Sequence, residues 1–128
     1  MQAHQIPVAV LVVNHNAMLL EGIAVLIRSQ PDMTLIGSAK CAYSALDAYL
    51  ETRPDITVID LELPDSSAIQ AIRRIRSADA NAKLIGVTTY ELDKSGPEAL
   101  TAGALAIIAK DRIGETLVDL IRNVARPQ

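Results

Sequence analysis

The sequence predicts an α/β fold, in which a parallel sheet is covered by helices on both faces. Short, continuous apolar runs typical of strands buried on both faces alternate with segments whose apolar residues recur at helical spacing. The alternation repeats five times in 128 residues, a length that suits one compact domain. Because a helix separates each strand from the next, we expect the strands to run parallel and to be joined by right-handed crossovers.

The elements follow in order along the chain. The first strand is predicted at residues 8–13 and the first helix at 17–29, where a Ser-Gln-Pro-Asp segment ends it. Either Ser66 or Ser67 is expected to cap the third helix, which runs to about residue 77. Gly103 is a natural left-handed stop for the fourth helix. The remaining strands are predicted at residues 33–39, 56–60, 83–87 and 105–109, and the remaining helices at 44–52, 96–102 and 114–124.

The composition excludes several classes of protein. Hydrophobic residues make up 50% of the chain and charged residues 21%, which argues against disorder. A net charge of −3 and three Tyr, with no Phe or Trp, argue against direct nucleic-acid binding. The single Cys41 excludes an internal disulfide and is expected to be an inert thiol. Because no apolar run is long enough to span a bilayer, we expect a cytoplasmic protein without membrane contact.

Polar side chains lie at the ends of four predicted strands. These residues are Asn14 and His15 after the first strand, Asp60 at the end of the third, Thr88 after the fourth and Lys110 after the fifth. Ligands of open α/β sheets bind at the carboxyl ends of the strands. The set suits a phosphoryl group, with Asp60 as the nucleophile, Thr88 as a donor to a phosphate oxygen and Lys110 neutralising charge. The alternative is a structural ion pair between Asp60 and Lys110.

Three segments resemble the receiver domains of bacterial response regulators. Residues 55–64 (DITVIDLELP) resemble their phosphorylation-site segment, residues 84–88 (LIGVT) their fourth strand, and residues 102–111 (AGALAIIAKD) their fifth strand. The spacing to Glu21-Gly22 resembles the subgroup that precedes a helix-turn-helix DNA-binding domain.

The resemblance extends over residues 6–125 and implies a flavodoxin-like (CheY-like) fold. Such a fold has a five-stranded parallel sheet of strand order 2-1-3-4-5, with five helices on both faces. We therefore expect a flexible N-terminus at residues 1–6, a receiver domain at 7–125, and a tail or the start of a linker at 126–128.

The resemblance also implies a regulatory domain that is not an enzyme. A sensor histidine kinase would phosphorylate Asp60 with the help of Mg²⁺, Thr88 would be the switch hydroxyl, and Lys110 would bind the phosphate. Pro64 would shape the loop beyond the acceptor, and the backbone carbonyl of Glu62 would be a metal ligand. Output would pass through the fourth helix, the fifth strand and the fifth helix, which are also the expected homodimer interface. A C-terminal domain outside this chain would contact DNA.

Two positions depart from the family's pattern. Receivers place two acids at the end of the first strand to hold Mg²⁺, whereas this chain has Asn14 and His15. Mg²⁺ prefers carboxylate and water oxygens, so a degenerate site of Asn14, His15 and Asp60, with the backbone carbonyl named above, predicts weakened or absent Mg²⁺-dependent phosphorylation. Ile107 stands where many receivers carry an aromatic ring that moves with the switch hydroxyl. We therefore expect an atypical receiver, in which contact between Asp60 and Lys110 holds one conformation.

Four other interpretations stay open. A conventional receiver would be phosphorylated on Asp60 despite the missing acids. A stand-alone interaction module would bind another protein and would have no DNA-binding partner domain. A small flavin- or nucleotide-binding enzyme is disfavoured, because residues 14–17 lack phosphate-cradling glycines. A transition-metal site would use His15 and Asp60, with His4 as the other nitrogen ligand.

Arginines on two helices complete the expectations. Arg73, Arg74 and Arg76 are expected to form a solvated helix face. Arg112 and Arg122 lie near acids at positions 111, 115 and 119 and near apolar residues at 117, 118, 120 and 121. This region is either part of a symmetric dimer interface or an ordinary wet surface.

Overall fold

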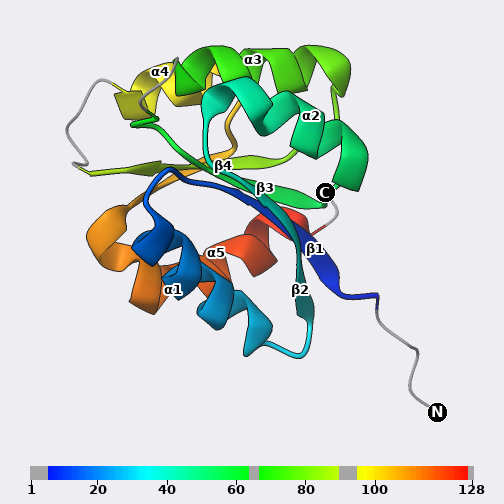
Figure 1. The fold of residues 1–128 in the computed structure, drawn as a ribbon, viewed down its shortest axis with the longest axis vertical. Coiled ribbons are helices and arrows are strands. Elements are labelled where there is room, and N and C mark those ends of the chain that lie inside the picture. The colour runs from blue at the N-terminus through cyan, green and yellow to red at the C-terminus, as the bar shows by residue number, and fades with distance from the viewer. Residues whose placement is uncertain (1–5, 64–66, 90–94, 127–128) are drawn as a thin grey trace.

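The computed structural model describes residues 6–63, 67–89 and 95–126. Within these ranges five parallel strands form one sheet in the order β2-β1-β3-β4-β5, which confirms the predicted topology (Figure 1). The strands are β1 (Val8–Val13), β2 (Met33–Ala39), β3 (Ile56–Asp60), β4 (Leu84–Thr88) and β5 (Ala106–Ala109). Strands β3 and β4 are buried along their whole length, as the continuous apolar runs predict.

Helices cover both faces of the sheet, as predicted. α1 (Ala17–Arg28) and α5 (Ile113–Ala125) pack on one face, and α2 (Ala42–Thr52), α3 (Ala68–Ala78) and α4 (Ser95–Ala102) pack on the other (Figure 1). A short 3-10 helix, η1 (Lys110–Arg112), joins β5 to α5. The sheet therefore separates two hydrophobic cores, both built mostly from Val, Ile, Leu and Ala.

Side-chain caps explain where two helices begin. Asn16 precedes α1, and its Oδ1 accepts a hydrogen bond from the backbone N–H of Leu19 at 3.0 Å. Ser67 precedes α3, and its Oγ accepts from the backbone N–H of Gln70 at 3.3 Å. The cap expected at Ser66 or Ser67 is therefore Ser67, and Ser66 lies outside the described residues.

The observed boundaries lie close to the predicted ones. α2 begins at Ala42, two residues before the predicted start, because Ala42 is buried in the core and Ser44 donates a side-chain hydrogen bond to the carbonyl of Cys41 within the first turn. β4 begins and ends one residue later than predicted, so Thr88 is its last residue instead of the residue that follows it. α4 ends before Gly103, which adopts φ 130° as the predicted stop requires.

The three arginines of α3 do not all face solvent. Arg73 and Arg74 are exposed, as predicted. The prediction is wrong for Arg76, because its guanidinium donates hydrogen bonds to the carbonyls of Ala80 and Gly103. Arg76 therefore joins the end of α3 to the turn after α4, a tertiary contact that helical periodicity does not reveal.

Tyr49 supplies an aromatic ring to the core beneath α2 and α3. It is 2% exposed, and its hydroxyl donates a 2.8 Å hydrogen bond to Oδ2 of Asp79. Burial, followed by this hydrogen bond, raises the pKa of Tyr49 to about 12. The same hydrogen bond lowers the pKa of Asp79.

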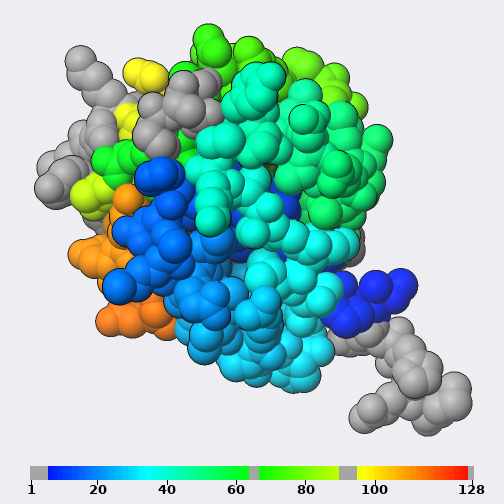
Figure 2. All heavy atoms as spheres, viewed as in Figure 1, coloured from blue at the N-terminus to red at the C-terminus, as the bar shows by residue number. Residues whose placement is uncertain are grey.

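The edge strand β2 lies against α1 and α2, and these three elements make up much of the face seen in Figure 2. Exposed and more buried side chains alternate along β2, in contrast to the central strands. No helix in the described ranges is long and apolar enough to cross a membrane. The predicted domain limits at residues 7 and 125 stay a prediction, because residues 1–5 and 127–128 lie outside the described part of the chain.

Candidate functional site

Four of the predicted polar residues meet at the carboxyl-terminal edge of the sheet. Asn14 follows β1, Asp60 and Thr88 end β3 and β4, and Lys110 follows β5. The strand register makes them neighbours, since Val13 pairs with Ile59, Asp60 with Val87, and Thr88 with Ala109. The structure therefore brings these four residues together, as the topology rule for open sheets requires.

Asp60 is the buried anion of this edge. It is 3% exposed, and its Oδ1 accepts a hydrogen bond from the backbone N–H of Glu62 at 2.9 Å. Its Oδ2 lies 3.7 Å from Nζ of Lys110. A buried carboxylate is stable only when donors or cations compensate for its lost hydration, and Asp60 has one of each.

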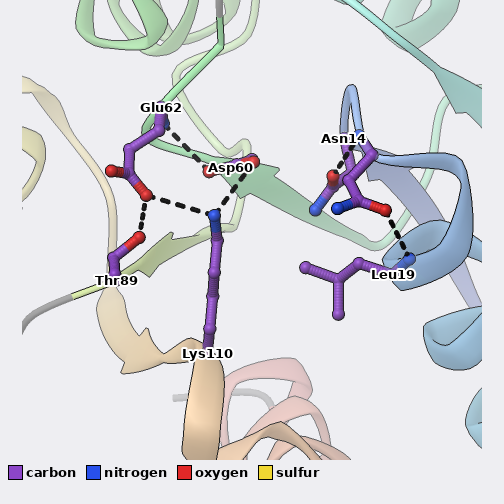
Figure 3. Close-up of polar contacts among 7 residues, drawn as sticks. Asn14, Leu19, Asp60, Glu62, Thr89 and Lys110 are labelled. Carbon is purple, nitrogen blue, oxygen red and sulfur yellow. Dashed lines mark hydrogen bonds and ion pairs between the residues drawn. The ribbon is translucent and has the colours of Figure 1, made fainter.

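Lys110 lies between two carboxylates. Its Nζ donates to Oε1 of Glu62 at 3.1 Å, which is shorter than its distance to Asp60 (Figure 3). The lysine side chain is 31% exposed and that of Glu62 is 42% exposed, so this contact lies on the partly exposed side of the site. Lys110 therefore links the buried acid to an acid at the surface.

The Glu62 side chain and Thr89 are site residues that sequence reasoning missed. The sequence assigned only the backbone carbonyl of Glu62 to the site, and Thr88 as its hydroxyl. In the structure the Thr89 hydroxyl also donates to Oε1 of Glu62, so one carboxylate oxygen receives both Lys110 and Thr89 (Figure 3). The consecutive threonines after a buried strand and the acid two positions beyond Asp60 were the available signals.

Asn14 and His15 occupy different environments. Asn14 is 1% exposed, and its Oδ1 accepts a hydrogen bond from the backbone N–H of Asn16 at 2.9 Å. Its own backbone N–H donates to the carbonyl of Ala39 at 2.9 Å. His15 is exposed. The amide oxygen of Asn14 is therefore used within the turn that leads into α1.

These residues are a poor donor set for Mg²⁺. The ion prefers several carboxylate and water oxygens. Asp60 offers one buried carboxylate, already beside the Lys110 ammonium, and Asn14 offers an amide oxygen bonded to the backbone. The Glu62 carboxylate accepts hydrogen bonds from Lys110 and Thr89. The predicted transition-metal ligand His4 lies outside the described residues. In the described ranges, no group of three or more His, Cys, Asp or Glu is arranged to hold a metal ion.

Thr88 and Ile107 lie on neighbouring strands at this edge. Thr88 is 1% exposed. Ile107 packs over Gly86, where an added Cβ atom would come within 2.8 Å of Ile107 Cδ1. The Ile107 side chain therefore fills the space above β4 that is open because Gly86 has no side chain. Pro64, predicted to shape the loop, lies outside the described residues.

Arg122 and Arg112 have partners within the chain. Arg122 Nε donates to Oδ2 of Asp32 at 2.8 Å, and Nη2 donates to Oε1 of Gln30 at 2.8 Å. Arg112 pairs with Glu115 at 3.8 Å, where both side chains are largely exposed. Arg122 thus holds α5 to the turn between α1 and β2, a role that its place in the sequence did not indicate.

The chain is similar to known proteins along most of its length. The family model described as "Response regulator receiver domain" matches residues 10–122. A curated relative, "Uncharacterized transcriptional regulatory protein YxjL" of Bacillus subtilis (strain 168), is 35% identical over 106 residues, which cover 83% of this chain and 49% of the relative. "DNA-binding transcriptional activator DevR/DosR" of Mycobacterium tuberculosis is 27% identical over 117 residues, which cover 91% of this chain and 54% of the relative. The chain spans about half the length of these curated relatives.

A solved structure agrees with this family. The two-component response regulator of the LuxR family from Aurantimonas sp. SI85-9A1 superposes with a TM-score of 0.87 and 30% sequence identity. The match covers 93% of this chain and 85% of that chain. The similarity in sequence and the similarity in fold therefore both indicate a response regulator receiver domain.

Proposed function

We propose, on the premise that this chain belongs to the response regulator receiver domain family, that it is the regulatory domain of a cytoplasmic two-component transcriptional regulator. It works as an atypical receiver, in which Mg²⁺-dependent phosphorylation of Asp60 is weakened or absent. Output passes through the surface formed by α4, β5 and α5. The domain is regulatory and not an enzyme, and its partners are a sensor histidine kinase and a DNA-binding domain outside this chain.

The charge balance around Asp60 carries the proposal. Its carboxylate is compensated by the Lys110 ammonium at 3.7 Å and by the Glu62 N–H at 2.9 Å. β1 ends in an amide and an imidazole instead of two carboxylates. Phosphoryl transfer to a carboxylate needs a cation that neutralises the phosphoryl oxygens. Asp60 and Glu62 share the Lys110 ammonium, so they attract Mg²⁺ much less than three uncompensated acids would.

The meeting of Asp60, Thr88 and Lys110 at one edge favours a conventional receiver as the second candidate. In that reaction a carboxylate oxygen of Asp60 attacks the phosphorus atom of the donor. The bond from phosphorus to the leaving group breaks, and an acyl phosphate forms. Lys110 would neutralise charge on the phosphoryl oxygens, and the Thr88 hydroxyl would donate to one of them. The two candidates therefore differ in their dependence on Mg²⁺ and in the yield of acyl phosphate.

Incubation with acetyl phosphate, in Mg²⁺ or in EDTA, separates the candidates. We expect intact-mass spectra to show at most trace acyl phosphate in both conditions. Asp111→Asn, at an exposed position beyond Lys110, is the matched control and should give the same spectra. Abundant Mg²⁺-dependent acyl phosphate that disappears in Asp60→Asn and persists in Asp111→Asn would contradict the atypical receiver and support the conventional one.

For assembly we propose a homodimer through α4, β5 and α5. Leu100 on α4 is 49% exposed, and Leu105, just before β5, is 52% exposed. Exposed large apolar side chains on neighbouring elements are typical of a surface that meets a protein partner. A second copy fits because a two-fold axis pairs the same patch of both subunits.

A further inference from the structure

The structure assigns a second function to Glu62: its carboxylate is a built-in anion that lies beside Lys110, where an oxyanion would bind. It binds Lys110, the cation that a phosphate or similar tetrahedral oxyanion would use, and the Thr89 hydroxyl beside it. An incoming oxyanion must therefore displace Glu62 before it can bind. The inference takes from the proposed function only that Lys110 is the anion-binding group of the pocket.

The contacts of a single carboxylate oxygen support this assignment. Oε1 of Glu62 accepts a hydrogen bond from Nζ of Lys110 at 3.1 Å and another from the Thr89 hydroxyl. An ammonium and a hydroxyl that converge on one oxygen are the donors that bind a phosphate oxygen. Figure 3 shows that both donors reach the same carboxylate oxygen, Thr89 from just after β4 and Lys110 from the start of η1.

A backbone hydrogen bond holds residue 62 beside the buried acid. The Glu62 N–H donates to Oδ1 of Asp60 at 2.9 Å, so residue 62 is held two positions beyond the buried acid. Asp60 and Glu62 then lie on either side of Nζ, at 3.7 Å and 3.1 Å. The ammonium is therefore shared between one buried carboxylate and one that is 42% exposed.

Electrostatics gives the direction of the effect. An oxyanion that approaches Lys110 meets two negative charges, and Glu62 carries the more exposed of the two. Replacement of Glu62 by Gln removes one of these charges and keeps the shape of the side chain. Coulomb repulsion at contact distance in a water-like dielectric corresponds to a change in affinity of about fivefold, and to more where water is partly excluded.

An ordinary surface ion pair is the alternative. Exposed pairs contribute little to stability, and Glu62 would then have no effect on anion binding beyond net charge. The position of Lys110 favours the built-in anion, because its Nζ lies closer to Oε1 of Glu62, at 3.1 Å, than to Oδ2 of the buried Asp60, at 3.7 Å.

Titration of the protein with inorganic phosphate, at fixed pH and ionic strength, tests the inference. Backbone amide NMR shifts of residues near Lys110 report binding, and inorganic phosphate forms no acyl phosphate with Asp60. Failure of this test therefore leaves the proposed function intact. The variants are Glu62→Gln and, as the control for net charge, Glu51→Gln at an exposed position on α2.

We expect Glu62→Gln to bind phosphate about fivefold more tightly than the unsubstituted chain, and Glu51→Gln to leave the affinity unchanged. Adding Thr89→Val to Glu62→Gln should reverse part of the gain, about threefold, because the hydroxyl donor is then missing. Thermal unfolding checks that each variant is folded. Equal affinities for Glu62→Gln and the unsubstituted chain, or an equal gain in Glu51→Gln, would overturn the inference.

Discussion

The guanidinium of Arg122 on α5 binds the carboxylate of Asp32 through two hydrogen bonds, at 2.8 Å from Nε to Oδ2 and 3.0 Å from Nη2 to Oδ1. Bidentate pairs of this kind are geometrically specific, because the planar guanidinium matches the carboxylate. The contact holds the last helix to the turn that begins β2.

The first prediction concerns the contribution of the Arg122–Asp32 pair to stability at low pH. The hydrogen bond from Arg122 is the main cause that lowers the pKa of Asp32 from its ordinary value of 3.8. A lowered pKa means that the stabilisation is present above pH 3.8 and is lost as the pH falls through the lower, folded-state value. Asp32→Asn should therefore lower the urea midpoint at pH 7 and have a much smaller effect in strong acid.

Asp119→Asn is the matched control for that experiment. Asp119 lies 3.6 Å from the same guanidinium, but its side chain is 77% exposed. Its replacement should leave the urea midpoint almost unchanged at both pH values. If Asp32→Asn and Asp119→Asn change the urea midpoint equally, the bidentate contact of Asp32 gives no extra stability, and the prediction is wrong.

The second prediction concerns the contribution of Tyr49 to stability at high pH. The raised pKa, about 12 against an ordinary 10.0, means that the stabilisation is complete below pH 10 and is lost as the pH rises toward 12. Tyr49→Phe should lower the free energy of unfolding by about 1 kcal/mol at pH 7 through loss of the hydrogen bond to Asp79. The variant should also show less loss of stability between pH 10 and 12.

Ultraviolet absorbance titration measures the phenol directly. Tyr43→Phe is the control, because that side chain is 80% exposed. The component that titrates last should disappear in Tyr49→Phe and remain in Tyr43→Phe. Its survival in Tyr49→Phe would refute the assignment.

The third prediction concerns the compensation of Asp60. Lys110→Met leaves a carboxylate that is 4% exposed without its cation, so we expect a loss of about 2 kcal/mol in the free energy of unfolding. In the Asp60→Asn background the same lysine replacement should have a much smaller effect. Urea unfolding of the four proteins gives the coupling energy, and additive effects would show that the two residues act independently.

The fourth prediction restores acids at the end of β1. Asn14→Asp with His15→Asp adds two carboxylates beside Asp60, one of them at a position that is 1% exposed. We expect the double variant to be less stable in EDTA by about 1–3 kcal/mol. Repulsion between the carboxylates and the loss of hydration on burial both disfavour their ionised forms. Mg²⁺ should restore the stability and bind at least tenfold more tightly than to the unsubstituted chain.

Isothermal titration calorimetry and thermal unfolding in Mg²⁺ or EDTA provide the measurements. Asn123→Asp, which adds charge at an exposed position of α5, should gain neither Mg²⁺ affinity nor sensitivity to EDTA. Tight Mg²⁺ binding by the unsubstituted chain would show that its donor set is adequate after all.

The fifth prediction concerns assembly. Leu105→Glu places a charge on the proposed α4–β5–α5 interface without entering the core, since Leu105 is 52% exposed. We expect sedimentation velocity to show a concentration-dependent dimer for the unsubstituted chain and a monomer for this variant. Val25→Glu on α1, at 58% exposure, is the control and should still dimerise. Dissociation by Val25→Glu alone would move the interface to α1.

Much of the fold could be predicted because burial on both faces leaves a simple mark in the sequence. The continuous run at residues 56–60 could only be a central strand, and every residue of it is buried. The same logic located Asp60 and Lys110, since the end of a parallel strand determines the edge at which a residue lies.

The contacts of long side chains could not be predicted in this way. Which way Glu62 turns depends on Lys110 and Thr89, which follow other strands of the folded sheet. Arg76 and Arg122 have many rotamers, and only tertiary neighbours select the carbonyls or carboxylate that they bind. Sequence spacing places such residues on a helix but does not choose their partner.

The sheet that separates the two cores also separates the two layers of helices. The candidate site lies at the edge of the sheet from which the chain enters each layer. Lys110 opens η1 and leads into α5 in one layer, whereas the segment after Glu62 leads to α3 in the other. The 3.1 Å contact between them therefore acts as a tie across the end of the sheet. A ligand that separates Lys110 from Glu62 would therefore act on two segments at once, the one that leads into α5 and the one that leads to α3, and these helices lie on opposite faces of the sheet.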